Sequence, residues 1–191
     1  VRNYLPLTDA DPNNSNNLIL FYTGRSQGID TRGNNANDWN NEHVWATSHG
    51  GFGTTAPMGT DLHNLRPTDV SVNSIRGNLD FDYGGNKVED IYGPGSMFCY
   101  VSSNSFEPRD EVKGDVARIL FYMAVRYEGG VSGELDLELN DLLGNTGPYM
   151  GKLSVLIEWH ILDPVDEFER NRNEVIYEIH GNRNPFIDYP E

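Results

Sequence analysis

The sequence predicts an α+β fold, with short strands and long loops in its N-terminal part and several helices after them. Residues 1–110 are rich in Gly, Asn, Asp and Ser and carry short apolar runs, whereas apolar residues after Asp110 recur at helical spacings. The chain has 191 residues, 37% of them hydrophobic and 23% charged, which is enough for a core and excludes a disordered tail or a fibrous repeat. With no internal repeat or linker, we expect one domain over residues 1–191.

The N-terminal part is expected to contain short strands between loops dense in Asn and Asp. The expected strands are residues 18–22, 43–46, 62–65 and 97–101. The expected loops are residues 9–17 and 30–41.

Helices are expected after Asp110 and, over two turns, after the third strand. Their ranges are residues 110–127, 149–161 and 165–179, with Pro164 near the last start and Gly181 as its stop. A short helix follows Pro67, because Thr68 or Asp69 can cap it and Gly77 can end it.

Charge and cysteine content exclude several classes of protein. Fourteen Lys and Arg against 29 Asp and Glu give a net charge of −15, the wrong sign for loose, field-driven binding of nucleic acid. The single cysteine cannot close an intrachain disulfide. No apolar run approaches the roughly 20 residues of a membrane span, so we expect no membrane association.

Two segments carry residues suited to catalysis: residues 41–45 and residues 61–78. On the expected short helix of the second segment, Asp69, Asn73 and Arg76 share one face. Asn is a mediocre residue inside a helix, so Asn73 invites a functional explanation. It is a candidate neutral oxygen ligand for a hard cation, beside an arginine that could bind phosphate.

In the first segment, Glu42 and His43 are neighbours on an expected strand. Strand neighbours point to opposite faces, so the two converge on one site only at a strand end or bend. If they converge, Glu42 can bind a divalent metal and His43 can take a proton from water. A strand, loop, strand and short helix carrying these residues is an arrangement suited to a one-metal phosphodiesterase.

The residues EHVW (42–45) and DLHNLRPTDVSVNSIRGN (61–78) resemble the endonuclease I family of bacterial periplasmic and extracellular nucleases, within the ββα-metal (His-Me finger) superfamily. The tail, with FERNRN (168–173) and HGNRNPFID (180–188), resembles the same family. This resemblance implies a ββα-metal core and Mg²⁺-dependent, sequence-nonspecific cleavage of DNA, RNA or both that leaves 5′-phosphates. It further implies His43 as general base, Glu42 and Asn73 as metal ligands, and Arg76 on the phosphate.

The resemblance also implies a secreted or periplasmic protein, with a leader removed before Val1. Some relatives use a transition-state arginine from the loop between the two strands, but residues 44–60 contain no Lys or Arg, so Arg66 or Arg76 would have to serve. Trp39, in a polar loop, is the best candidate for base stacking. Asn64 is expected to orient His43, to hold the Asn-rich loop in place or to join Arg66 in binding the substrate. His49 is a further candidate phosphate contact.

Several alternatives stay open at this point. The metal could be Mg²⁺, Ca²⁺ or Mn²⁺, since an amide and a carboxylate suit all three. The substrate could be DNA or RNA, bound weakly and with strong metal dependence, and no obligate protein partner is implied. The alternative function is a catalytically lapsed acidic domain that binds divalent cations or a partner protein. The charge of −15 favours that alternative, and the set of Glu42, His43 and Asn73 favours a nuclease.

Overall fold

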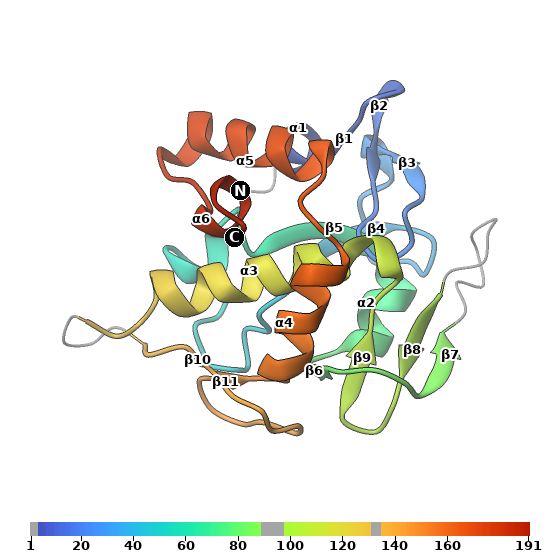
Figure 1. The fold of residues 1–191 in the computed structure, drawn as a ribbon. Helices are drawn as coiled ribbons and strands as arrows, with labels where there is room; N and C mark the ends of the chain where they lie inside the picture. Colours follow the sequence, from blue (N-terminus) through green and yellow to red (C-terminus); the bar gives the residue numbers. More distant parts are fainter. Residues whose placement is uncertain (1–3, 89–97, 131–134) are drawn as a thin grey trace.

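The computed structural model describes residues 4–88, 98–130 and 135–191, and it has the mixed α+β architecture that the sequence predicts. Figure 1 shows α3 running through the middle of the molecule, with α5 and α6 above it, β1, β2 and β3 at the upper right, and β6 to β11 below it. The longer helices are α2 (Val70–Arg76), α3 (Lys113–Arg126), α4 (Leu153–Leu162) and α5 (Glu167–His180). Shorter helical segments are α1 (Leu5–Thr8), α6 (Pro185–Asp188), η1 (Ile29–Thr31), η2 (Met58–Thr60) and η3 (Asp110–Val112).

Within the described residues the strands form four small sheets. The first contains β1 (Ala10–Asp11), β2 (Asn14–Ile19) and β3 (Ser26–Gly28), and the second pairs β4 (Trp39–His43) with β5 (Leu65–Asp69). The third has the order β6 (Asp80–Phe81), β9 (Ser105–Glu107), β8 (Cys99–Val101) and β7 (Asn86–Val88). The fourth pairs β10 (Glu138–Leu139) with β11 (Tyr149–Met150).

The expected helices are confirmed, because local signals determine their ends. Asp69 caps α2 by accepting hydrogen bonds from the backbone nitrogens of Ser71 and Val72. Asp166 caps α5 in the same way, and Gly181, with a positive φ of 75°, ends it. The expected helix at 149–161 begins later, since its first two residues form β11. None of the described helices is long and apolar enough to cross a bilayer.

The expected strand positions are partly wrong. The expected loop at 9–17 contains β1 and the first four residues of β2, and the two strands pair as a hairpin. The strand expected at 18–22 is β2, which starts and ends earlier than expected. The strand expected at 43–46 is β4, which starts four residues earlier and ends at His43, the first residue of the expected range. Pairing with β5 in the register Glu42↔Arg66 fixes these bounds. Of the strand expected at 97–101, β8 forms the last three residues, and residue 97 lies outside the described residues.

The third strand departs most from expectation, since β5 starts at Leu65 and runs through Pro67. The carbonyl of Pro67 accepts a hydrogen bond from the Phe21 nitrogen at 2.8 Å, on the edge away from β4. The nitrogen and carbonyl of one strand residue point to the same edge, so proline removes no hydrogen bond to β4 here.

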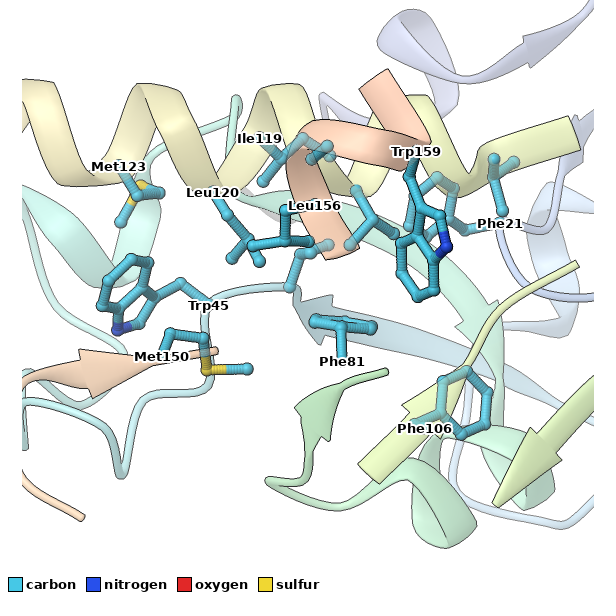
Figure 2. Close-up of a cluster of buried hydrophobic side chains, with 14 of the residues drawn as sticks. Phe21, Trp45, Phe81, Phe106, Ile119, Leu120, Met123, Met150, Leu156 and Trp159 are labelled. Atoms are coloured by element: carbon cyan, nitrogen blue, oxygen red, sulfur yellow. The ribbon is translucent and has the colours of Figure 1, made fainter. Parts of the chain in front are cut away.

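Two buried clusters hold the β4–β5 pair from both ends. Trp39, at the start of β4, packs with Leu65 and Ile176 in the smaller cluster. Trp45, just beyond β4, belongs to the larger cluster between α3, α4 and the strands, where Figure 2 places it near Leu120 and Met150. Both tryptophans are fully buried, so the strand between them has little freedom to shift.

Candidate active site

The β4–β5 pair and the helix that follows it carry the expected site residues. Residues Asn40 and Glu42 share one face of β4, and α2 lies against that face. On α2, Asn73 contacts Asn40, and Arg76, one turn later, contacts Glu42. This arrangement brings both expected metal ligands to the same strand–helix contact.

Glu42 is a buried carboxylate, and its Oε1 is hydrogen-bonded and ion-paired. The side chain is 3% exposed, and its Oε1 accepts a hydrogen bond from the Tyr22 hydroxyl at 2.7 Å and lies 3.1 Å from Nη1 of Arg76. Burial raises the pKa of Glu42 above its usual value, while Arg76 and the Tyr22 hydrogen bond oppose that rise. Among the described residues Oε2 receives no side-chain hydrogen bond, and the backbone N–H of His43 also lowers the pKa of Glu42.

Asn73 is held by its amide nitrogen. Its Nδ2 donates to Oδ1 of Asn40 at 2.7 Å and to the backbone carbonyl of Asn41 at 3.4 Å. A backbone carbonyl only accepts, so these contacts fix which end of the Asn73 amide faces β4. The Oδ1 atom is left on the other side, and it too is absent from the buried orphaned atoms of the described chain.

His43 stands at the end of β4, where its side chain is half-buried. Its Nε2 lies 3.1 Å from the carbonyl of Gly59. Because that carbonyl can only accept, Nε2 carries the proton and Nδ1 presents a lone pair. Burial lowers the pKa of His43 below its usual 6.5, the Gly59 bond partly offsets this, and the Arg76 charge lowers it further. The ring is therefore a neutral base near pH 7.

This set of groups suits one hard cation and one proton transfer. Carboxylate and amide oxygens are the donors that Mg²⁺, Ca²⁺ and Mn²⁺ prefer. Among the residues that the structure describes, no group of three His, Cys, Asp or Glu side chains could hold a metal. A site here would therefore use the two oxygens of Glu42 and Asn73, with water completing the coordination, as is usual for Mg²⁺.

Comparison with known proteins shows the family to which this chain belongs. The family model described as Endonuclease I matches residues 4–191. The chain belongs to the Endonuclease I family. It is 61% identical over its whole length to an extracellular ribonuclease of Bacillus amyloliquefaciens and 60% identical to one of Bacillus subtilis, and it spans 65% of the length of each. An extracellular deoxyribonuclease of Aeromonas hydrophila is 29% identical over 69% of this chain and 50% of its own length.

In this Endonuclease I chain, the phosphate-binding role expected of Arg76 is wrong. It is fully buried, and its guanidinium donates to the carbonyls of His43 at 3.1 Å and Val44 at 2.6 Å while lying 4.9 Å from the centre of the Phe81 ring. The expected contact with a phosphate is not supported, because no part of this guanidinium reaches solvent. Its place is behind the site, where it holds the end of β4 and faces Glu42.

The three expected substrate-binding residues are also interior. Arg66 is 3% exposed and ion-paired to Asp9 and Asp115, at 2.8 and 3.1 Å. Asn64 is fully buried and bonds the backbone of Trp45 through both ends of its amide. Trp39 is 1% exposed and donates to the carbonyl of Gly28. Their burial is incompatible with direct contact to a nucleic acid.

His49 is likewise buried, with both ring nitrogens against backbone carbonyls, so it is not a phosphate contact either. Sequence reasoning missed Tyr22, Asn40, Gly59 and Arg32, which all adjoin the site. Tyr22 and Gly59 lie 20 and 17 residues from Glu42 with no recognisable spacing. Asn40 could have been found, because it precedes Glu42 by two residues and so shares its strand face.

Proposed function

We propose that this chain is a metal-dependent endonuclease with little sequence preference that hydrolyses phosphodiester bonds of RNA, DNA or both. One observation carries the proposal. A carboxylate oxygen of Glu42 and an amide oxygen of Asn73 are left open at one strand–helix contact, and His43 at the strand end presents an unprotonated Nδ1. The names of its relatives, ribonucleases and deoxyribonucleases, support both kinds of nucleic acid as substrates.

The chemistry follows from the atoms that are free. His43 accepts a proton from water at Nδ1, while Nε2 keeps its own proton on the Gly59 carbonyl. The water oxygen attacks phosphorus, the bond to the 3′ oxygen breaks, and that oxygen takes a proton from bulk water, so the products are a 5′-phosphate and a 3′-hydroxyl. A divalent ion bound by Glu42 and Asn73, which we take to be Mg²⁺ with Ca²⁺ or Mn²⁺ as substitutes, supplies Lewis acidity that stabilises charge on the phosphate and the leaving oxygen.

Arg32 takes the phosphate-binding role expected of the buried arginines. It is exposed, its Nη2 donates to Oδ1 of Asn41 at 3.0 Å, and its guanidinium lies 5.5 Å from the centre of the Trp39 ring. Asn41 and His43 share the face of β4 opposite to Asn40 and Glu42, so this cation stands on the side of the base, and the base can meet the metal ligands at the strand end where His43 lies. At physiological salt the screening length is about 8 Å, so a nearby cation can act despite the net charge of −15.

The relatives named extracellular ribonuclease and extracellular or periplasmic deoxyribonuclease support a site of action outside the cytoplasm. We therefore propose a secreted or periplasmic protein. An acidic surface would favour solubility there, and it makes substrate binding depend on the metal and on few cations.

Digestion of a supercoiled plasmid and of a long RNA tests the proposal, with Mg²⁺ and with EDTA, for the wild-type protein and for His43→Ala. We expect cleavage with Mg²⁺ only and a loss of at least about a hundredfold in His43→Ala. His180→Ala is the matched control, because His180 is an exposed histidine at the end of α5. Cleavage that persists in EDTA, or in His43→Ala at the control's rate, would refute the proposal. Metal binding without any cleavage would favour the lapsed domain instead.

A further inference from the structure

We propose that Tyr22 and Asn40 are positioning residues that aim the two metal-binding oxygens. Each binds one atom of a branched end group and so leaves the other atom of that group for the ion: Tyr22 acts on Glu42, and Asn40 acts on Asn73. This inference rests on the proposed function, because it takes Glu42 and Asn73 as the ligands.

On the Glu42 side, Tyr22 is the donor that decides the carboxylate's orientation. Nη1 of Arg76 donates its hydrogens to the carbonyls of His43 and Gly77, so it offers Glu42 charge but no well-formed hydrogen bond. Within the described chain, the Tyr22 hydroxyl makes the one side-chain hydrogen bond that this carboxylate receives. Holding Oε1 at 2.7 Å turns Oε2 away from the phenol.

Tyr22 is itself rigidly placed. It is fully buried, and its ring centre lies 5.0 Å from those of Phe21 and of Phe106. Its pKa lies well above the usual value, because burial disfavours the phenolate and the Glu42 charge repels it. The packing of this ring holds its hydroxyl against Oε1 of Glu42.

On the other side, Asn40 fixes the amide of Asn73. Asn40 precedes Glu42 by two residues and shares its strand face, so the strand itself sets the spacing between the two positioned groups. Both hydrogens of Asn73 Nδ2 have acceptors, Asn40 Oδ1 and the Asn41 carbonyl, and the oxygen must then point away from β4. Without Asn40 the longer contact at 3.4 Å would hold the amide alone.

The test measures metal binding without substrate, by Mn²⁺ titration followed by electron paramagnetic resonance. We expect Tyr22→Phe and Asn40→Leu each to weaken Mn²⁺ binding by about 10- to 100-fold. With nucleic acid present, the metal concentration for half-maximal activity should rise by the same factor, while the rate at saturating metal changes little. Asn40→Asp, which keeps an acceptor oxygen for Asn73, should bind Mn²⁺ at least as tightly as the wild type.

Tyr122→Phe is the matched control, since the Tyr122 hydroxyl donates to a buried carboxylate, Asp61, at 3.0 Å and away from the site. It should lower thermal stability without changing Mn²⁺ affinity. Wild-type affinity in both Tyr22→Phe and Asn40→Leu would overturn the inference. If Tyr22→Phe does not fold, the Mn²⁺ affinity of Asn40→Leu still tests the inference, because Asn40 is only half-buried. Glu42→Gln tests the proposed function separately from the positioning inference. Wild-type Mn²⁺ binding by Glu42→Gln would refute the assignment of Glu42 as a metal ligand.

Discussion

Arg66 provides a sharp test of the distinction between interior and substrate-facing arginines. Its guanidinium binds Asp9 at 2.8 Å and Asp115 at 3.1 Å and lies 4.0 Å from the centre of the Phe21 ring. Arg172 also contacts Asp9, at 3.2 Å, and Arg118 lies 3.7 Å from Asp115. Replacing Arg66 by methionine keeps much of the apolar stem but takes from each of these buried aspartates one of its two arginine partners.

The expected loss of folding stability follows from these missing ion pairs. Breaking a buried ion pair by removing one partner costs about 3–5 kcal/mol, because a buried charge loses its compensation. Each aspartate keeps one arginine, which favours the lower part of this range. For a domain of this size each kcal/mol lowers the melting temperature by roughly 2–4 °C, so Arg66→Met should melt roughly 6–20 °C below the wild type.

Thermal melting followed by circular dichroism measures this shift, with urea unfolding as a second determination. Arg170→Met, at an exposed position on α5, is the control and should change stability by less than about 0.5 kcal/mol. Below both transitions, the Michaelis constant of Arg66→Met for nucleic acid should match the wild type. An unchanged melting temperature together with a Michaelis constant raised tenfold would mean that Arg66 contacts the substrate, and the reasoning would be wrong.

Three further predictions follow from the site and its surroundings. Arg32→Ala should leave thermal stability unchanged and reduce the slope of log affinity against log salt by about 1, whereas Arg170→Ala should leave both unchanged. Activity requires deprotonated Glu42 and His43; burial raises the pKa of Glu42 and lowers that of His43, so kcat/KM should fall as the pH is lowered, with a log slope approaching two where both groups protonate. Burial lowers the pKa of His63 to about 4, so the folded state binds fewer protons; between pH 7 and pH 4, urea unfolding should show His63→Phe losing about 3 kcal/mol less stability than the wild type.

Local signals in the sequence predicted the helices and the face of α2 that carries Asn73. Asp69 and Gly77 mark the ends of α2 within one short segment, and the spacing on that helix places Asn73 and Arg76 on one side. The family resemblance singled out Glu42 and His43, and the structure places them at the end of β4 as the argument from strand geometry requires.

Contacts between distant segments could not be predicted from the sequence. The ends of β4 depend on its register with β5, whose paired residues lie 22 to 30 positions away. The burial of Arg66 depends on Asp9 and Asp115, 57 and 49 residues distant, so an arginine in a motif was taken for a surface cation. Tyr22 reaches Glu42 through the same kind of tertiary contact.

In the proposed reaction, water activated by His43 Nδ1 attacks the phosphorus and expels the 3′ oxygen. Mass spectrometry of the ends formed from a defined RNA and from the DNA of the same sequence, cleaved in ¹⁸O-labelled water, tests it most directly. We predict a 5′-phosphate carrying one ¹⁸O and an unlabelled 3′-hydroxyl from each substrate that is cut. A 2′,3′-cyclic phosphate or a 3′-phosphate would show that the ribose hydroxyl attacks or that the other bond breaks, and either result would contradict the account.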